Sequence, residues 1–146
     1  MALLQISEPG QSTAPHHHNL ACGIDLGTTN SLVASVMSGQ TKLISDQNNN
    51  SMLPSVVHYG QDKMTVGVDA YQYTTTDPTN TILSVKRYMG VDYSEASEFK
   101  NLPYRLVKNG NNVSFETSIG DVSAIEVSAS ILSALKDRAE DALGGE

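Results

Sequence analysis

The chain has 146 residues, of which 39% are hydrophobic and 17% charged, so it is long enough to bury one core. Its formal net charge of -7 and its nine Lys and Arg residues argue against a protein that wraps nucleic acid, because such affinity comes mainly from basic contacts to phosphate. No apolar run approaches the length of a membrane span, and no secretion leader is recognisable. We therefore expect a cytoplasmic protein.

Residues 1–19 are predicted to be a flexible leader, since they are rich in Ser, Pro and Gln. The triplet His16, His17 and His18 could in principle bind a metal, but the leader offers little to pack against a ligand site. A mobile leader or an engineered addition is the favoured interpretation.

The single cysteine, Cys22, cannot form an internal disulfide, which agrees with a reducing compartment. It lies in an uncharged strand predicted at 20–24, where a small side chain of this kind is usually buried. We expect it to have no chemical role.

A short run of small and hydroxylated residues joins this strand to a second one predicted at 31–37. The run matches neither the Walker loop nor the dinucleotide fingerprint. It consists of Asp25, Leu26, Gly27, Thr28, Thr29 and Asn30.

This run has the chemistry of a phosphate-binding hairpin. Gly27 permits a backbone path that a side chain would block, so that N–H groups can converge on an anion, and Thr28 and Thr29 add hydroxyl donors. Asp25 would oppose a phosphate unless it held Mg²⁺ through water, as that ion prefers. The same residue types are also common in ordinary turns, so an unspecialised hairpin remains open.

The middle of the chain is predicted to mix short strands and helices after a polar loop at 45–51. One hairpin is expected around the turn at 60–63 and another around 109–112. A helix is expected at 81–89, because Asp77 and Pro78 precede it with helix-start chemistry and Gly90 can end it.

The final helix has the clearest signals. Ser123 and Glu126 have the spacing of a capping box, and Gly144 provides a stop. Apolar residues recur along one face, which predicts burial against the rest of the domain: Val127, Ile131, Leu135, Ala139 and Leu143.

The phosphate run resembles the first phosphate loop of the superfamily of actin, sugar kinases and seventy-kilodalton heat-shock chaperones, and resembles the chaperones most closely. Segments 53–59, 66–70 and 78–90 resemble chaperone segments in the same order. The opening residues and the phrases at 53–59 and 84–87 are similar to the bacterial branch that serves iron–sulfur cluster assembly. The resemblance extends from about residue 20 to residue 146.

This resemblance implies an α/β fold that forms part of an actin-like, ribonuclease H-like ATPase lobe with a small α+β subdomain. The implied divisions are the first strands and phosphate hairpin at 20–52, the small subdomain at 53–119 and a return helix at 120–146. The rest of the nucleotide-binding domain and the substrate-binding domain are not recognisable in the sequence. We therefore expect a fragment with weak or absent ATPase activity, whose unpaired sheet edge favours self-association or strand exchange.

The resemblance also implies site residues, cofactors and partners. ATP or ADP would bind with Mg²⁺, and a J-domain co-chaperone and an iron–sulfur scaffold protein would be the partners. Lys86 alone would be read as a solvated residue near a helix end, but the family's matching lysine orients the attacking water. The implied phosphate ligands are Gly27, Thr28, Thr29 and Asn30, with Thr28 acting also at the γ-phosphate and Asp25 holding hydrated Mg²⁺.

Two alternatives remain open. A sugar or acetate kinase of the same superfamily would share the hairpin but should offer acidic and amide groups to a small acceptor. A non-catalytic interaction module would use residues 25–30 merely as a turn.

Overall fold

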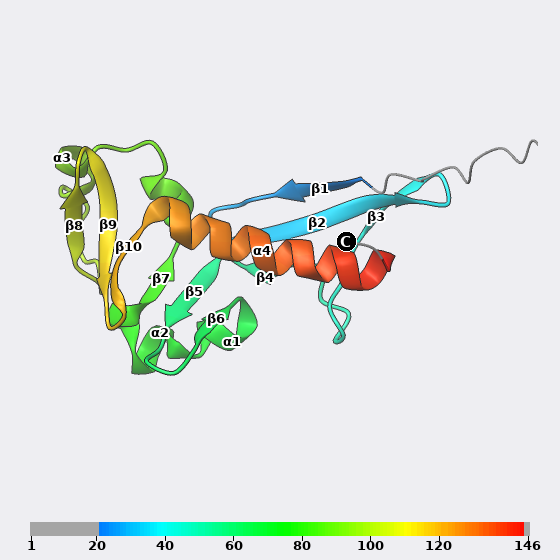
Figure 1. The fold of residues 1–146 in the computed structure, drawn as a ribbon, viewed down its shortest axis with the longest axis horizontal. Coiled ribbons are helices and arrows are strands. Elements are labelled where there is room, and N and C mark those ends of the chain that lie inside the picture. The colour runs from blue at the N-terminus through cyan, green and yellow to red at the C-terminus, as the bar shows by residue number, and fades with distance from the viewer. Residues whose placement is uncertain (1–20, 145–146) are drawn as a thin grey trace, which may run out of the picture.

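The computed structural model describes residues 21–144, and these form a mixed α and β structure in which one long helix runs beside three small sheets (Figure 1). The leader and the histidine triplet predicted within 1–19 lie outside the described residues. None of the helices in the described part is both long and apolar enough to cross a membrane.

The first sheet is built around a central strand. Strand β2 (Asn30–Met37) pairs antiparallel with β1 (Cys22–Asp25) along one edge. Its other edge is shared by β3 (Gln40–Leu43) and β4 (Leu53–Pro54), which pair with its two ends. Alternate β2 residues are buried, so one face of this strand carries the core and the other is more accessible.

The prediction that Cys22 is buried is wrong. Its side chain is exposed, as are all four residues of β1. Within residues 21–144, β1 pairs with β2 alone, so it is an edge strand of this sheet. Apolar composition did not reveal this, because burial depends on which neighbours a strand finds.

Two further antiparallel sheets follow in the chain. The second has the order β6-β5-β7, from β5 (Val56–Tyr59), β6 (Met64–Val66) and β7 (Thr81–Leu83). The third has the order β10-β9-β8, from β8 (Leu106–Asn109), β9 (Asn112–Thr117) and β10 (Gly120–Ser123). The two predicted hairpins are therefore confirmed as β5–β6 and β8–β9.

Short helical segments link these strands. They are α1 (Val68–Tyr71), α2 (Tyr73–Thr76), the 3-10 helices η1 (Pro78–Asn80) and η2 (Val85–Tyr88), and α3 (Tyr93–Ala96). The predicted loop at 45–51 contains no strand or helix, and Asp46 Oδ1 organises it by accepting hydrogen bonds from the amides of Asn48 and Asn50.

The continuous helix predicted at 81–89 is wrong. Thr81 and Ile82 are fully buried in β7, where they pair with β5, and Ser84 then adopts a left-handed backbone conformation with φ 53°. Only Val85–Tyr88 is helical, as a 3-10 turn. β-Branched residues suit a paired, buried strand, and this tertiary pairing outweighs the local helix-start signal.

The long helix α4 (Ala124–Leu143) confirms both of its end signals. Ser123 Oγ accepts a hydrogen bond from the Glu126 amide, and the Ser123 amide donates to Glu126 Oε2 at 2.8 Å. Ser123 Oγ also donates to Glu126 Oε2 at 2.7 Å, and this bond, together with the one from the Ser123 amide, holds the pKa of the Glu126 carboxyl below its usual range. At the other end Gly144 has φ 66° and donates its amide to the Glu140 carbonyl.

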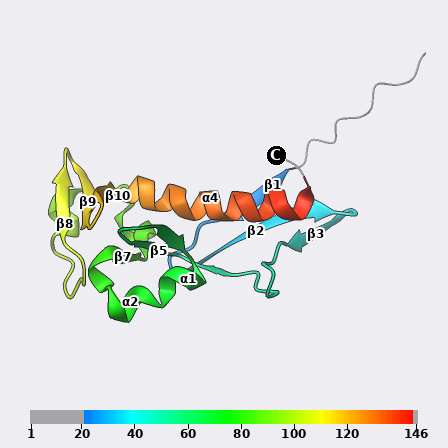
Figure 2. The same ribbon diagram turned by 60° about the horizontal axis from the view of Figure 1, so that its bottom comes forward.

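One face of α4 packs into the core, as its periodicity predicts. The buried members of the predicted stripe are Val127, Ile131, Leu135 and Ala139, while Leu143 is half-buried. The helix contacts β1 and β2 of the first sheet and reaches η2, β9 and β10 near its beginning. Figure 2 shows it lying along the strands β1 and β2 and extending to the β9–β10 hairpin. It also contacts β5 and β6 of the second sheet, so α4 packs against all three sheets.

Candidate functional site

The turn between β1 and β2 is tightly closed around Gly27. A Cβ atom at this position would lie 2.0 Å from the carbonyl oxygen of Asn30. The prediction that a side chain is blocked here is confirmed, and the cause is this close backbone approach. Only glycine fits the turn without displacing it.

Two buried serines attach this turn to the chain that follows β4. The Gly27 amide donates to Ser31 Oγ at 3.2 Å, and Ser31 Oγ lies 2.9 Å from Ser55 Oγ. Ser55 Oγ in turn donates to the Gly27 carbonyl at 2.9 Å, and the Ser55 amide donates to the Thr29 carbonyl at 2.8 Å. The turn is thus held from within by four hydrogen-bonding contacts.

The remaining groups of the turn are accessible. Asp25, Thr28, Thr29 and Asn30 are exposed, whereas Leu26 is half-buried against the core. The structure therefore brings one carboxylate, two hydroxyls and one amide side chain together on a short, anchored segment. The Gly27 amide already donates to Ser31 Oγ. Gly27 therefore allows the turn to be compact, and the neighbouring residues supply the accessible polar groups.

The donor set fits a polyphosphate with Mg²⁺. In the described residues no group of three His, Cys, Asp or Glu side chains is placed to hold a metal ion. Mg²⁺ is commonly bound through only one or two carboxylates, together with substrate phosphates and water. Asp25 beside a turn that exposes two hydroxyls is compatible with this requirement, and the close backbone approach at Gly27 is the geometric observation that supports the fit.

Lys86 is exposed on η2, away from the core residues that fix that 3-10 turn. Val85 and Tyr88 are buried, and the Tyr88 ring packs edge-on with the Phe115 ring at a centroid distance of 5.1 Å. Arg87 lies with its guanidinium carbon 5.2 Å from the centre of the Phe99 ring. Arg87 thus has a packing partner and Lys86 remains accessible.

Strand register relates Lys86 to the turn. Val56, at the start of β5, pairs with Leu83, at the end of β7, and η2 begins two residues later. Ser55, the residue just before β5, is the one bonded to Gly27. The turn and η2 therefore lie at the same end of β5.

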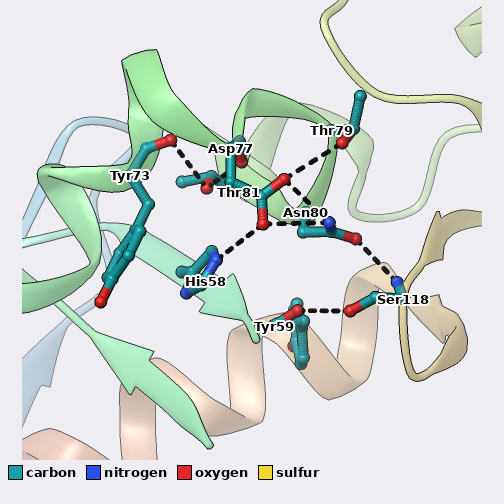
Figure 3. A network of polar contacts seen from close by, with 8 residues as sticks. All are labelled: His58, Tyr59, Tyr73, Asp77, Thr79, Asn80, Thr81 and Ser118. Atoms are coloured by element: carbon teal, nitrogen blue, oxygen red, sulfur yellow. Dashed lines mark hydrogen bonds and ion pairs between the residues drawn. The ribbon is translucent and has the colours of Figure 1, made fainter. Parts of the chain in front are cut away.

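A second polar cluster was not anticipated from the sequence (Figure 3). His58 Nε2 lies 3.0 Å from Asp77 Oδ2, and the His58 ring stacks on Tyr73 at a centroid distance of 3.9 Å. The Asn80 side-chain amide donates to both Asp77 oxygens and accepts from the Ser118 amide at 2.7 Å. This cluster ties β5, η1 and the β9–β10 turn together.

The hydrogen bond from His58 is the main cause that holds the pKa of Asp77 below its usual range, with Asn80 and Thr79 contributing. The local signal at Asp77 is its turn chemistry next to Pro78, and this signal predicts a helix start and not a polar cluster. No local signal connects His58 to Asp77 or Asn80, because they lie 19 and 22 residues further along the chain.

Comparison with known proteins now decides the family. The family model described as Hsp70 protein matches residues 21–146. The chain belongs to the Hsp70 family. It is also similar to curated proteins named chaperone protein HscA homolog, and the prediction of both the family and its HscA-like branch is confirmed.

Three of these relatives show the extent of the similarity. The HscA homolog of Aliivibrio salmonicida is 54% identical and matches 99% of this chain. Those of Chromobacterium violaceum and Haemophilus influenzae strain PittGG are 55% and 53% identical and match 100% of it. In each case the match covers 24% of the relative, so this Hsp70-family chain spans about a quarter of the length of the curated relatives.

Proposed function

We propose that this chain contributes the first phosphate-binding turn of an Hsp70-family chaperone that binds and hydrolyses ATP to control its hold on a protein client. The observation that carries the proposal is the closed turn at Gly27, which presents the exposed Thr28 and Thr29 hydroxyls beside the Asp25 carboxylate. Membership of the Hsp70 family supports the assignment of a nucleotide to this turn.

The residues of the turn have different roles in this proposal. Thr28 and Thr29 donate hydrogen bonds to the β- and γ-phosphate oxygens, and the Asn30 side chain adds a further donor. Gly27 keeps the turn compact enough for the phosphates to approach the backbone. Asp25 accepts hydrogen bonds from water on Mg²⁺, which when bound neutralises part of the polyphosphate charge.

Lys86 is proposed to orient the attacking water, and Thr28 to act at the γ-phosphate end. An exposed ammonium on a 3-10 turn at the same end of β5 as the phosphate turn supports this role. Positioned charge of this kind accelerates phosphoryl transfer by electrostatic stabilisation, without any covalent step on the protein.

The division of the chain is part of the proposal. We assign 20–52 and 120–146 to an actin-like lobe and 53–119 to a small subdomain. The change of sheet between β4 and β5, and the return of α4 to β2, support these boundaries. The turn supplies one side of a phosphate clamp, so we expect the 146 residues alone to have little ATPase activity and to associate through the exposed edge of β1.

The proposed partners are a J-domain co-chaperone and an iron–sulfur scaffold protein. The proposed location is the cytoplasm of a bacterial cell. Their support is the similarity to HscA homologs over the whole chain. ATP and ADP would act as ligands that favour different arrangements of the full chaperone.

The test uses a full-length chaperone, meaning a protein that contains this chain together with the part found only in its longer relatives. Lys86→Ala should lower kcat for ATP hydrolysis by about a hundredfold or more, with ATP affinity changed less than about threefold. Lys63→Ala is the matched control, since Lys63 is also an exposed lysine but lies in the β5–β6 turn.

The products of the same assay separate the alternatives. Inorganic phosphate as the product supports a hydrolase, whereas transfer to a small acceptor would favour the sugar or acetate kinase. Equal hydrolysis by the Lys86→Ala and Lys63→Ala variants would contradict the role of Lys86. Failure of the unmodified protein to bind ATP would favour an interaction module.

A further inference from the structure

We infer that Ser55 is a positioning residue for the phosphate turn, acting through a closed ring of hydrogen bonds that it forms with Ser31 and Gly27. This inference rests on the proposed function, because it concerns the shape of the turn that would receive the phosphates. Ser55 lies outside that turn, directly after the last residue of β4, and its side chain bonds to the turn.

The number of hydroxyl protons determines which group donates and which accepts in each hydrogen bond of the ring. A serine hydroxyl has one proton to donate and can accept at its oxygen. Ser55 Oγ gives its proton to the Gly27 carbonyl, so the 2.9 Å contact between the two serine oxygens must use the proton of Ser31. Ser31 Oγ then accepts from the Gly27 amide.

The ring therefore starts and ends on the same residue. The Gly27 amide donates to Ser31, Ser31 donates to Ser55, and Ser55 donates to the Gly27 carbonyl. Each hydroxyl donates once and accepts once, and such chains of hydrogen bonds polarise and strengthen one another. Both backbone polar groups of Gly27 are satisfied by it.

The ring is shielded from water. Ser31 and Ser55 are each only 1% exposed. Opening the ring at either serine leaves buried polar groups without a hydrogen-bond partner. Such groups have lost their hydrogen bonds to water and gain none in the protein, which destabilises the folded arrangement. Backbone movement is the available way to relieve that cost, and the turn is the part that is accessible to solvent.

The Ser55 backbone strengthens the same attachment. Its amide donates to the Thr29 carbonyl at 2.8 Å, so Ser55 holds the turn at Gly27 and at Thr29. Thr28 lies between these two anchored positions and its side chain is exposed. The geometry of the phosphate-facing hydroxyls thus depends on a residue that they do not contact.

Ser55 also stands at the junction between two sheets. The residue before it ends β4, which pairs with β2, and the residue after it begins β5, which pairs with β6 and β7. The ring consequently fixes the phosphate turn against the start of the 53–119 segment.

The experiment compares three alanine variants of the full-length chaperone. Ser55→Ala and Ser31→Ala each open the ring. Ser35→Ala is the matched control, because Ser35 is buried on the same face of β2 and its hydroxyl donates to the Ala21 carbonyl at 2.8 Å, away from the turn. Ser31→Ala keeps the test available if Ser55→Ala does not fold.

The first readout is amide hydrogen exchange of the peptide that contains 25–31, measured without nucleotide. Both ring variants should exchange faster there than the Ser35→Ala variant. Exchange equal to that of the control would show that the ring does not hold the turn and would overturn the inference.

The second readout is affinity for adenosine, ADP and ATP by titration calorimetry with Mg²⁺. Opening the ring should weaken ADP and ATP binding by about tenfold, as expected for one buried hydrogen bond left unmade, and leave adenosine binding unchanged. A purely structural role would weaken all three ligands together or none of them, and either result would overturn the inference. If the unmodified protein bound ADP no better than adenosine, the proposed function itself would fail, while the exchange measurement would still report on the ring.

Discussion

Replacing Gly27 by alanine is the sharpest test of the closed turn. The added Cβ would lie 2.0 Å from the Asn30 carbonyl oxygen and 3.2 Å from the Asn30 carbonyl carbon. Contacts below 3.0 Å are essentially never tolerated by a real Cβ, so the two backbone positions must separate by about 1 Å or more. Asn30 begins β2 and pairs with Pro54, so the movement reaches the first sheet.

The magnitude follows from the hydrogen bonds that this movement stretches. The Gly27 amide already lies 3.2 Å from Ser31 Oγ, and the Ser55 bonds to the Gly27 and Thr29 carbonyls measure 2.9 and 2.8 Å. An extra 1 Å takes these contacts beyond hydrogen-bonding distance. At about 1 kcal/mol for each of two or three bonds, the free energy of unfolding should fall by about 2–3 kcal/mol.

The assay is urea-induced unfolding of the full-length chaperone, combined with ADP titration in the presence of Mg²⁺. Gly27→Ala should lower both the unfolding free energy and ADP affinity. Gly23→Ala is the matched control, because nothing lies within 4 Å of a Cβ at that β1 position. A Gly27→Ala protein as stable as the control, with unchanged ADP affinity, would refute the argument from close approach.

Three further predictions follow from other parts of the structure. Ile131→Ala removes a fully buried side chain from α4 and should lower the free energy of unfolding in urea by about 3–4 kcal/mol. Leu132→Ala, at a position 38% exposed, should lower it by less than about 1 kcal/mol, and equal losses would contradict the assigned core face. Asp25→Asn should abolish most of the Mg²⁺ dependence of ADP affinity, measured by titration with and without the ion, and an unchanged dependence would remove Asp25 from the site. The pKa of the Asp77 carboxyl is lowered mainly by the hydrogen bond from His58. The ionised carboxylate therefore stabilises the fold above the unfolded-state pKa of about 4, and this stabilisation is lost as the pH falls through the folded-state pKa. The thermal midpoint of Asp77→Asn should change less than that of the unmodified protein between about pH 5 and pH 3, and parallel curves of midpoint against pH would contradict this.

Local signals in the sequence were sufficient for several elements. The capping box at Ser123 and the periodic apolar face identified α4, because both act within one helix and its contact with the core. The hairpins around 60–63 and 109–112 were also predictable, since turn residues between alternating strands specify close antiparallel pairing. The need for glycine at position 27 could also be predicted, because the residue lies in a short turn between two strands.

Long-range pairing explains what the sequence did not show. The segment at 81–83 has helix-start residues before it, but β5 offers it a buried strand partner. Cys22 resembles a core residue, yet β1 lies at the outer edge of its sheet. The contacts from Ser55 to Gly27 and from His58 to Asp77 join residues 28 and 19 positions apart, so no local pattern could indicate them.

The most direct test of the account is an experimental structure of the full-length chaperone with ADP and Mg²⁺. The account predicts that the β-phosphate lies within hydrogen-bonding distance of the turn at 27–30. It also predicts that the Asp25 carboxylate contacts water on the metal ion. Phosphates bound elsewhere, with the Thr28 and Thr29 hydroxyls facing only solvent, would contradict the central claim.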